Sequence, residues 1–354
     1  MAARPELLLV NHFALDTVCG TTVMFGEMLR IAPRAAPGIA FAYESHEPFA
    51  SPEALRARLD AAHAGAACVV AINAQIEVGW ASSEALFAWC RERGVPAFVY
   101  AHDYWPQHRP ALETLVARHG ARVIASTPFV ADAIRREGFD CGVVDVGVPL
   151  PDAWPSPVPR AVPPIVASAG RLVPRKRLAD VVRGFAASGL DGRARLYLRL
   201  LPSQVFGDAS DRAQLEEIEH EIAASRLAAV TLDRRPGELP DYATYSAYAC
   251  TSSYEGFGMP VIEAAFHGCP PLMSDIPPHR RSAEGMFGAH AQEHLFPVGD
   301  WAALGALLRD EILTGRRAAR IAAGLDALRR TIEARWSLAA TARALGRLAL
   351  DAGR

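Results

Sequence analysis

The sequence predicts an α/β protein with two doubly wound domains of the Rossmann type, and three observations lead to this prediction. Short apolar runs alternate with helical patterns over residues 6–138, and the alternation resumes after residue 164. A proline-rich stretch over 149–164 separates the two halves. Strand–helix alternation favours a parallel sheet with helices on both faces. The length of 354 residues also suits two domains.

In the first half, apolar runs predict buried strands over 6–13, 67–73, 96–103 and 121–127. The stretches between them predict helices over 21–32, 52–64, 82–94 and 128–138. Pro33 should end the first helix, since proline lacks an amide hydrogen. Leu55, Leu59 and Ala62 fall on one face of the second helix, and the third should begin at a serine cap and end at Gly94.

Prolines separate the halves, and the pattern then restarts. Proline fixes the backbone and removes donors, so 149–164 predicts neither helix nor strand. Later apolar runs predict strands over 164–171, 194–201, 228–235, 247–253 and 270–275, and the tail over 335–354 predicts one amphipathic helix. We expect an N-terminal domain over 1–150, a linker over 151–164, a second domain over 165–330, and a helix within 331–354 that packs back toward the first domain.

Composition and charge exclude several classes of protein. The formal net charge of −2 gives no overall field that would attract nucleic acid. The six cysteines are dispersed without a Cys-x-x-Cys pair, which is typical of a reducing cytosol. No apolar run approaches the length of a membrane span. We therefore expect a cytoplasmic protein whose membrane contact, if any, is peripheral at the inner face.

The strongest chemical signal is the segment from Glu255 to Glu263. Gly256 and Gly258 precede Pro260, a residue that suits the first turn of a helix. A glycine-rich loop that leads into a helix offers free amides and a positive dipole end to an anion such as phosphate. The two carboxylates should then face neutral groups, and sugar hydroxyls fit. The simpler alternative is that both glutamates only favour the helix dipole, which explains the surrounding glycines poorly.

A second signal is the basic turn that follows the strand over 164–171. Arg171, Arg175, Lys176 and Arg177 come after Gly170 and before a helix. Arginine forks and lysine point charges both bind phosphate. The turn therefore predicts a binding site for a pyrophosphate leaving group. The alternative, which is commoner for a run of charges, is a basic turn exposed to solvent. No aromatic residues interleave the charges, which disfavours a nucleic-acid patch.

Together these segments resemble the retaining GT-B glycosyltransferases of family 4, also called glycosyl transferases group 1. The family carries a Glu-x7-Glu motif, a Gly-Arg turn followed by Lys, a His-Asp pair after a strand, and a glycine loop after the first strand. The matching residues here are Glu255 with Glu263, Gly170 with Arg171 and Lys176, His102 with Asp103, and Gly20. The resemblance covers nearly the whole chain and implies a central cleft between the two domains.

The resemblance implies a role for each matching residue. Glu263 would hold the ribose hydroxyls, Glu255 would orient the transferred sugar, and Arg171 and Lys176 would neutralise the departing diphosphate. His102 would lie across the cleft. The catalytic residues would be Glu255, Arg171, Lys176 and His102, and none of them would act as a conventional base. The implied donor site comprises Gly20, Arg171, Lys176, Arg234, Glu255, Gly256, Phe257, Gly258, Met259, Pro260 and Glu263, and the acceptor site comprises Asp103, Tyr104 and Trp105.

The chain also departs from the family pattern. Arg280 and Arg281 stand where the family often has a glutamate, and the strand over 194–201 lacks the usual glycine after it. The motif near the linker reads Val146-Gly147-Val148-Pro149. These differences concern the choice of nucleotide and acceptor more than the class of reaction.

Other patterns have plainer interpretations. His290, Glu293 and His294 match an inverted zinc motif but lack a third ligand, so we interpret them as a surface loop. His12 is more often structural. The aromatic residues Trp80, Phe87 and Trp89 occur at helical spacing and favour the core over a binding platform.

The predicted function is a retaining transferase that moves a hexose from a nucleoside diphosphate sugar to a sugar, lipid-linked sugar or other hydroxyl. Without an Asp-x-Asp in a donor-site position, we expect no metal and no cofactor. Envelope polysaccharide or lipopolysaccharide synthesis is implied by the resemblance alone. The alternatives are a GT-B epimerase or phosphorylase-like enzyme, and a non-catalytic nucleotide-sugar-binding subunit. Activity should depend on closure of the two domains.

Overall fold

The computed structural model describes residues 4–12, 15, 20–45, 51–74, 80–156, 158–202, 207–235 and 241–352. It divides into two compact units. Unit 1 comprises residues 1–150 with 333–354, and unit 2 comprises residues 151–332. Each unit is built on one sheet of parallel strands, so the predicted α/β class with two doubly wound domains is confirmed.

Six parallel strands form the sheet of unit 1, in the order β2-β1-β3-β4-β5-β6. Their apolar side chains explain the strand propensity: Leu8, Val69 and Val99 are fully buried in the core on one face. The strands are β1 (Glu6–Asn11), β2 (Ala40–Ser45), β3 (Ala66–Ile72), β4 (Ala97–Ala101), β5 (Arg122–Ala125) and β6 (Gly142–Val143).

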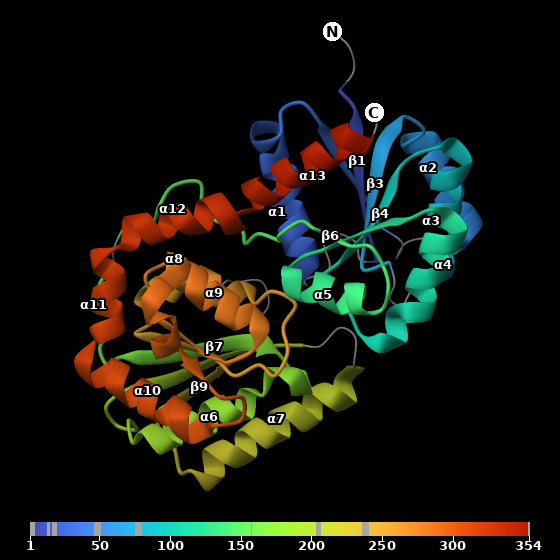
Figure 1. Cartoon of the computed structure of the whole chain (residues 1–354). Coiled ribbons are helices and arrows are strands. Elements are labelled where there is room, and N and C mark those ends of the chain that lie inside the picture. Colours follow the sequence, from blue (N-terminus) through green and yellow to red (C-terminus); the bar gives the residue numbers. More distant parts are fainter. Residues whose placement is uncertain are drawn as a thin grey trace. The chain divides into compact units, whose positions relative to one another are not determined.

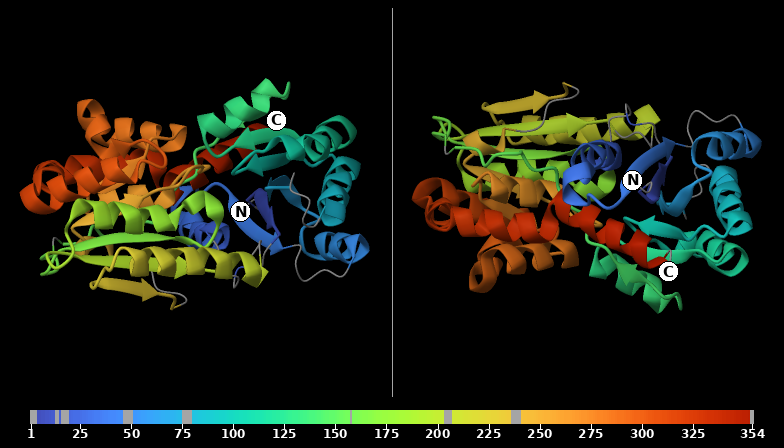
Figure 2. Two further views of the ribbon diagram at one scale, coloured as in Figure 1. Left: turned by 90° about the horizontal axis from the view of Figure 1, so that it is seen from below. Right: turned by 90° about the horizontal axis from the view of Figure 1, so that it is seen from above.

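Helices cover this sheet and include the C-terminal one. Residues Phe87 and Trp89 are fully buried and Trp80 packs against the same core, as predicted. The helix α13 packs on α1, and Figure 2 shows the two side by side. The helices are α1 (Gly20–Ala35), α2 (Pro52–Ala62), α3 (Trp80–Arg93), α4 (Arg109–His119), α5 (Pro128–Arg136) and α13 (Leu338–Ala352), with the 3-10 turn η1 (Pro106–His108).

Unit 2 also has six parallel strands, in the order β12-β11-β10-β7-β8-β9. The strand order reverses between β7 and β10, which makes the carboxyl ends of these two neighbours the expected ligand site of such a sheet. The strands are β7 (Ile165–Arg171), β8 (Arg195–Leu201), β9 (Val230–Asp233), β10 (Ala247–Cys250), β11 (Pro271–Ser274) and β12 (Leu295–Phe296).

Helices lie on both faces of the second sheet. Figure 1 shows α8 and α9 on the opposite face from α6, α7 and α10. The helices are α6 (Leu178–Ser188), α7 (Gly207–Ala224), α8 (Met259–Phe266), α9 (Pro277–Phe287), α10 (Trp301–Thr314), α11 (Arg316–Ala323) and α12 (Leu325–Trp336). Three 3-10 segments complete the unit: η2 (Pro174–Lys176), η3 (Tyr242–Thr244) and η4 (Gly288–His294).

Two glycines allow α6 and α10 to pack closely. A Cβ on Gly184 would lie 2.7 Å from a methyl carbon of Leu304, and one on Gly305 would lie 2.9 Å from the carbonyl oxygen of Gly184. Larger residues at these two positions would push the helices apart. This contact buries Leu304 against the core beneath the sheet.

Four local expectations were wrong. The first helix continues through Pro33 to Ala35, because a proline in the last turn removes only one hydrogen bond. The third begins at Trp80, so Ser82 and Ser83 lie inside it and do not cap it. Ala62 is exposed at the end of α2. The tail is not one helix: α12 ends at Trp336, and α13 starts at Leu338.

The break between α12 and α13 has a physical cause. The amide of Val148 donates to the carbonyl of Trp336 at 2.7 Å, and the amide of Leu338 donates to the carbonyl of Val148 at 3.2 Å. The chain around Ser337 therefore pairs with the extended segment around Val148, and at this point it leaves helix geometry. A Cβ on Gly147 would lie 2.3 Å from the carbonyl carbon of Ser337, so glycine is required for this approach. Between residues 149 and 164, the described part of the chain forms neither helix nor strand, as predicted.

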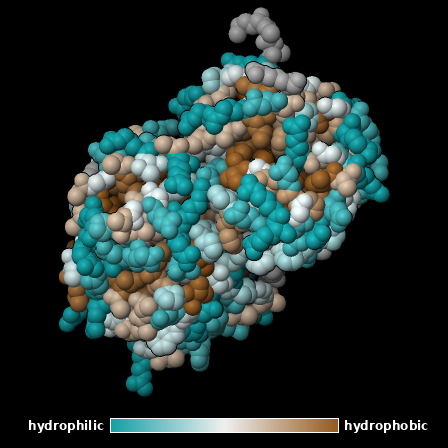
Figure 3. Space-filling model, viewed as in Figure 1, coloured by the Kyte–Doolittle hydropathy of each residue, from teal (hydrophilic) through white to brown (hydrophobic). Residues whose placement is uncertain are grey.

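In the described part of the chain, no helix is long and apolar enough to cross a membrane. The face in Figure 3 is largely hydrophilic, with apolar residues visible between polar ones.

Candidate functional site

The candidate site lies at the carboxyl ends of β7 and β10, which are neighbours in the sheet of unit 2. From β7 the chain enters the basic turn η2, and from β10 it enters the glycine loop that leads to α8. The basic turn and the Glu255–Glu263 segment are far apart in the sequence. The strand order therefore brings together the two segments that carried the strongest chemical signals.

Lys176 and Glu255 form the central ion pair of this site. The Nζ atom of Lys176 donates to Oε1 of Glu255 at 2.5 Å. The hydroxyl of Ser252 donates to the same oxygen at 2.7 Å. Arg175 lies farther away, with one guanidinium nitrogen 3.7 Å from Oε2 of Glu255. The pair is well shielded, since 13% of the Lys176 side chain and 9% of the Glu255 side chain are exposed.

Backbone contacts hold the two loops together. The hydroxyl of Thr251 donates to the carbonyls of Lys176 at 3.0 Å and Arg177 at 2.9 Å. The amide of Ser253 donates to the carbonyl of Arg175 at 2.8 Å. Arg177 adopts a left-handed conformation with φ of 49°, which turns the chain from η2 into α6. The position of Lys176 is therefore fixed by the backbone as well as by its carboxylate partner.

Electrostatics keep Glu255 ionised. Burial alone would raise the pKa of this carboxyl, but the neighbouring charges of Lys176 and Arg175 outweigh burial and lower the pKa to about 2. Glu255 is thus a hydrogen-bond acceptor at neutral pH and does not act as a proton donor.

The glycine loop has a steric reason for its composition. Gly258 caps α8 with φ of 89°, and a Cβ there would lie 3.1 Å from Cδ2 of His279. Phe257 is buried, and Met259 and Pro260 are the first two residues of α8. The first amides of a helix generally have no partner within it, but here Pro260 has no amide hydrogen and the amide of Val261 donates to the carbonyl of Gly258 at 3.3 Å. The binding of an anion by the amides of this loop therefore stays a prediction.

Beneath the loop lies a cluster of buried polar groups. Sγ of Cys250 is 3.7 Å from Nε2 of His279. Nδ1 of His279 donates to the carbonyl of Ser274 at 2.9 Å. Burial raises the pKa of the Cys250 thiol, but the His279 ring opposes it and the pKa is lowered overall. Sequence analysis did not single out Cys250, Ser252 or His279, although the positions after strands of an α/β sheet are where such residues gather.

Glu263 lies in the second turn of α8. The hydroxyl of Tyr242 donates to Oε2 of Glu263 at 2.9 Å. Desolvation raises the pKa of Glu263 to about 7, and the Tyr242 hydrogen bond only partly opposes this shift. The pKa of Glu255 is lowered by the charges of Lys176 and Arg175, whereas the pKa of the half-buried Glu263 is set by burial and by the Tyr242 hydroxyl.

The other predicted donor-site residues are spread more widely. Arg171 is the last residue of β7 and is half-buried, and Arg234 is exposed after β9. Arg235, its neighbour, pairs with Asp233 at 2.9 Å. Asp233 also accepts from Arg199 at 2.6 Å, so Arg235 is tied to a structural network.

In unit 1, the predicted residues gather after the strands as well. Asn73 follows β3 in a left-handed conformation with φ of 50°, and its Oδ1 accepts from the amide of His102 at 2.8 Å. Its carbonyl lies 3.1 Å from Nε2 of His12. Asn73 therefore joins the ends of β1, β3 and β4, a role that the sequence analysis missed. A polar residue directly after a buried strand was the available signal.

His102 is a neutral side chain. Burial lowers its pKa to about 4, and its ring packs edge-on against Tyr100 with centroids 4.6 Å apart. Its Nε2 is buried, and no described residue forms a hydrogen bond with it. Asp103 is half-buried, Tyr104 is buried and Trp105 is exposed. Gly20 is the first residue of α1, and most of the loop before it lies outside the described residues.

The two histidines of the inverted zinc motif have different partners. His290 is exposed and pairs with Glu293 at 2.8 Å, whereas His294 is buried and its Nδ1 donates to the carbonyl of Pro271 at 2.8 Å. The two rings therefore serve different purposes. The segment is the 3-10 helix η4, so the expectation of a surface loop was wrong.

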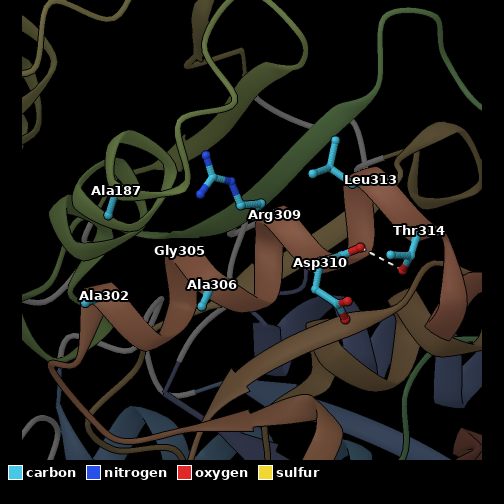
Figure 4. Close-up of a pocket in the computed structure, with 8 residues that line it drawn as sticks. All are labelled: Ala187, Ala302, Gly305, Ala306, Arg309, Asp310, Leu313 and Thr314. Carbon is cyan, nitrogen blue, oxygen red and sulfur yellow. Dashed lines mark hydrogen bonds between the residues drawn. The ribbon is translucent and has the colours of Figure 1, made fainter.

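A separate pocket lies between α6 and α10 (Figure 4). It contains none of the predicted site residues. Its lining residues are Ala187, Ala302, Gly305, Ala306, Arg309, Asp310, Leu313 and Thr314.

Comparisons with known proteins agree with the geometry. Residues 157–322 match the model of the family described as glycosyl transferases group 1. This range contains the whole candidate site of unit 2, including Lys176, Glu255 and Glu263. No curated protein sequence matched the chain.

Several solved structures share the fold over both units. HepE from Anabaena, in complex with UDP and glucose, has a TM-score of 0.73 at 14% identity and covers 98% of this chain and 100% of its own. Sucrose-phosphate synthase from Thermosynechococcus elongatus has a TM-score of 0.72 at 16% identity, covering 98% and 99%. A UDP-forming trehalose-phosphate synthase from Burkholderia vietnamiensis has a TM-score of 0.68 at 14% identity, again covering 98% and 99%. The fold is thus the GT-B fold.

Proposed function

We propose that the chain is a retaining hexosyltransferase, and the match of residues 157–322 to the family described as glycosyl transferases group 1 supports this proposal. The donor is a nucleoside diphosphate hexose, and the acceptor is a hydroxyl of a sugar or a lipid-linked glycan. The observation that carries the proposal is the contact of Lys176 with Glu255 where the strand order reverses.

The charges of the site suit a diphosphate leaving group. When the bond between the sugar and the phosphate breaks, negative charge develops on the phosphate oxygen. Lys176 and Arg175 are cations already held in place by Glu255 and by the backbone of the opposing loop. Preorganised cations stabilise such charge without reorganisation at the moment of reaction. We propose that Arg171, the last residue of the strand that leads into this turn, adds to the field.

The same cations support a reaction without a metal ion. We propose that Lys176, Arg175 and Arg171 supply the neutralisation that a divalent cation supplies elsewhere. Glu255 then keeps one oxygen on Lys176 and offers the other to hydroxyls of the transferred sugar, and Glu263 accepts from the ribose.

In the retaining reaction that we propose, attack and departure occur on the same face of the sugar. The bond from the anomeric carbon to the phosphate oxygen breaks, and the bond to the acceptor oxygen forms. The acceptor proton passes to the departing phosphate oxygen, so no side chain has to act as a base. The pKa values of Glu255 and His102, both below neutrality, are consistent with roles in orientation.

We propose a UDP-hexose as the donor. The HepE structures hold UDP, and one holds UDP-glucose. The acceptors in the names of the structural relatives differ, so the acceptor is proposed as a class, with envelope glycans as the context that the family resemblance implies. We place the reaction in the cytoplasm, since the cysteines are dispersed and the five that the structure describes form no disulfide.

The test begins with donor binding. A thermal-shift screen of UDP, GDP and ADP sugars should raise the melting temperature most with the true donor. Turnover with candidate acceptors is then followed by release of the nucleotide, and NMR of the product gives the anomeric configuration. An inverted product overturns the retaining mechanism.

The same assay separates the alternative functions. An epimerase would convert the donor without an acceptor, a phosphorylase-like enzyme would need inorganic phosphate, and a binding subunit would bind without turnover. Lys176→Ala should lower kcat by about 100-fold or more, the cost typical of losing one electrostatic donor at a transition state. Wild-type turnover in this variant would remove the assigned role of Lys176.

A further inference from the structure

Directly beneath the proposed donor site, three buried side chains offer metal ligands of different kinds. One sulfur of Cys250, one ring nitrogen of His279 and one carboxylate oxygen of Glu255 all lie within 4.8 Å of one another. Cys250 and Glu255 are each 7% exposed and His279 is fully buried. We propose that this cluster is an inhibitory site for a thiophilic divalent cation such as Zn²⁺, which competes with Lys176 for Glu255.

The distances suit a tetrahedral ion. Sγ of Cys250 and Nε2 of His279 are 3.7 Å apart. Zinc–sulfur and zinc–nitrogen bonds of about 2.3 and 2.0 Å at a tetrahedral angle span roughly 3.5 Å. These two ligands are therefore close to their bound separation before any ion arrives. Only the carboxylate of Glu255 has to move toward them.

The orientation of His279 is already that of a metal ligand. Its Nδ1 donates to the backbone carbonyl of Ser274 at 2.9 Å, which leaves Nε2 facing Cys250. Such a hydrogen bond on the second ring nitrogen is the usual support of a metal-binding histidine. Gly258 lies beside the ring, since a Cβ at this position would be 3.1 Å from Cδ2 and 3.2 Å from Nε2 of His279.

The charges balance when the ion binds. In the free protein, Cys250 and His279 share one proton and Glu255 is neutralised by Lys176. Binding of M²⁺ forms bonds to the sulfur, to Nε2 and to a carboxylate oxygen, and it releases that one proton to solvent. Ser252, whose hydroxyl is 3.6 Å from Sγ of Cys250 and 2.7 Å from Oε1 of Glu255, or a water can complete the tetrahedron.

Occupancy of the site should impair donor binding. A carboxylate drawn toward the ion leaves Lys176 without its partner and withdraws Glu255 from the sugar. The inhibitory half of the proposal rests on the proposed function, whereas the metal site itself depends only on the three ligands. The two halves can therefore fail separately.

The first experiment is a titration with Co²⁺ after treatment with a chelator, in a Cys19→Ser background because Cys19 lies outside the described residues. We expect one equivalent to bind with a thiolate-to-cobalt charge-transfer band in the near ultraviolet. Cys250→Ser should abolish the band, and His279→Gln should weaken affinity about tenfold or more. Cys269→Ser, which replaces another buried thiol of the same unit, should leave the band and basal activity unchanged.

The second experiment is calorimetry with UDP-glucose, with and without Zn²⁺. We expect Zn²⁺ to weaken binding at least tenfold in the background protein and to have no effect in Cys250→Ser. Absence of the cobalt band in the background protein overturns the metal site, even if a variant fails to fold, because that measurement needs no variant. A band without any effect on UDP-glucose overturns the inhibition. If UDP-glucose fails to bind the metal-free protein, the proposed donor is wrong, while the cobalt titration still decides the site.

Discussion

Lys176 and Glu255 are 79 residues apart in the sequence, yet Nζ of Lys176 lies 2.5 Å from Oε1 of Glu255. The contact exists because β7 and β10 are neighbours in the sheet, with β8 and β9 placed on the far side of β7. One residue came from the basic turn and the other from the glycine loop. The pair joins the two halves of the candidate donor site into one unit.

This pair should matter for stability. Lys176→Met should destabilise the protein by about 3 kcal/mol, because it leaves the buried carboxylate of Glu255 without its main countercharge. The double variant Lys176→Met/Glu255→Gln should recover most of that loss. Urea denaturation of the wild type, Lys176→Met, Glu255→Gln and the double variant measures the coupling.

The exposed pair of Arg30 with Glu27 provides the control. Its side chains are 43% and 40% exposed, and Arg30→Met should cost less than about 1 kcal/mol. Equal losses in the free energy of unfolding of Arg30→Met and Lys176→Met would show that burial does not strengthen the Lys176–Glu255 pair.

Donor affinity should depend on the ionisation of Glu263. Its pKa of about 7 means that the carboxyl loses an acceptor position as the pH falls below neutrality. UDP should therefore bind more weakly at pH 6 than at pH 8 by calorimetry. Glu263→Gln should bind weakly at both values, and a wild-type pH dependence in this variant would exclude Glu263 as the titrating group.

The same group predicts a pH dependence of stability. A carboxyl with a raised pKa in the folded state contributes stability that is fully present below its unfolded value of 4.5 and is lost as the pH rises through about 7. Relative to Glu263→Gln, the wild-type protein should lose on the order of 2 kcal/mol between pH 5 and pH 8. Parallel unfolding curves across this range would rule out the raised pKa.

Gly258 should tolerate no side chain. Gly258→Ala forces an unfavourable φ and brings its Cβ to 3.1 Å from the fully buried His279 ring, so both stability and UDP affinity should fall. Gly192→Ala is the matched control, since Gly192 has φ of 80° with open space around it. The control should cost about 1–2 kcal/mol from backbone strain alone, and Gly258→Ala should cost clearly more in thermal unfolding. Similar losses of stability in Gly258→Ala and Gly192→Ala would mean that the glycine loop can move away from the His279 ring.

Asn73 should affect turnover without affecting the donor. Asn73→Gly keeps the left-handed backbone but removes the Oδ1 that accepts from the amide of His102. We expect kcat to fall about tenfold while UDP affinity, which we assign mainly to the candidate site in unit 2, stays unchanged. Asn73→Asp retains an acceptor and should restore part of the rate. A wild-type kcat in Asn73→Gly would show that the position of His102, as held by Asn73, does not matter for the reaction.

Local features were predictable because their causes are local. The strands follow from apolar runs, and Gly94 and Gly138 end their helices or turns with positive φ as their positions suggested. The glycine loop was visible for the same reason, since Gly256, Gly258 and Pro260 occur together. The break at Ser337 was not visible, because it depends on pairing with Val148 in a distant segment.

The amino-acid sequence by itself determined the α/β class, the proline-rich boundary and the two segments that carry the chemistry. Only the tertiary structure decided that these segments meet, since strand order depends on packing across a whole sheet and is not encoded by any one strand. It also placed His279 and Cys250 beneath the glycine loop and left Glu255 ionised while Glu263 titrates near neutrality. The two glutamates thus differ because Glu255 has the ammonium group of Lys176 beside it and Glu263 has only the hydroxyl of Tyr242.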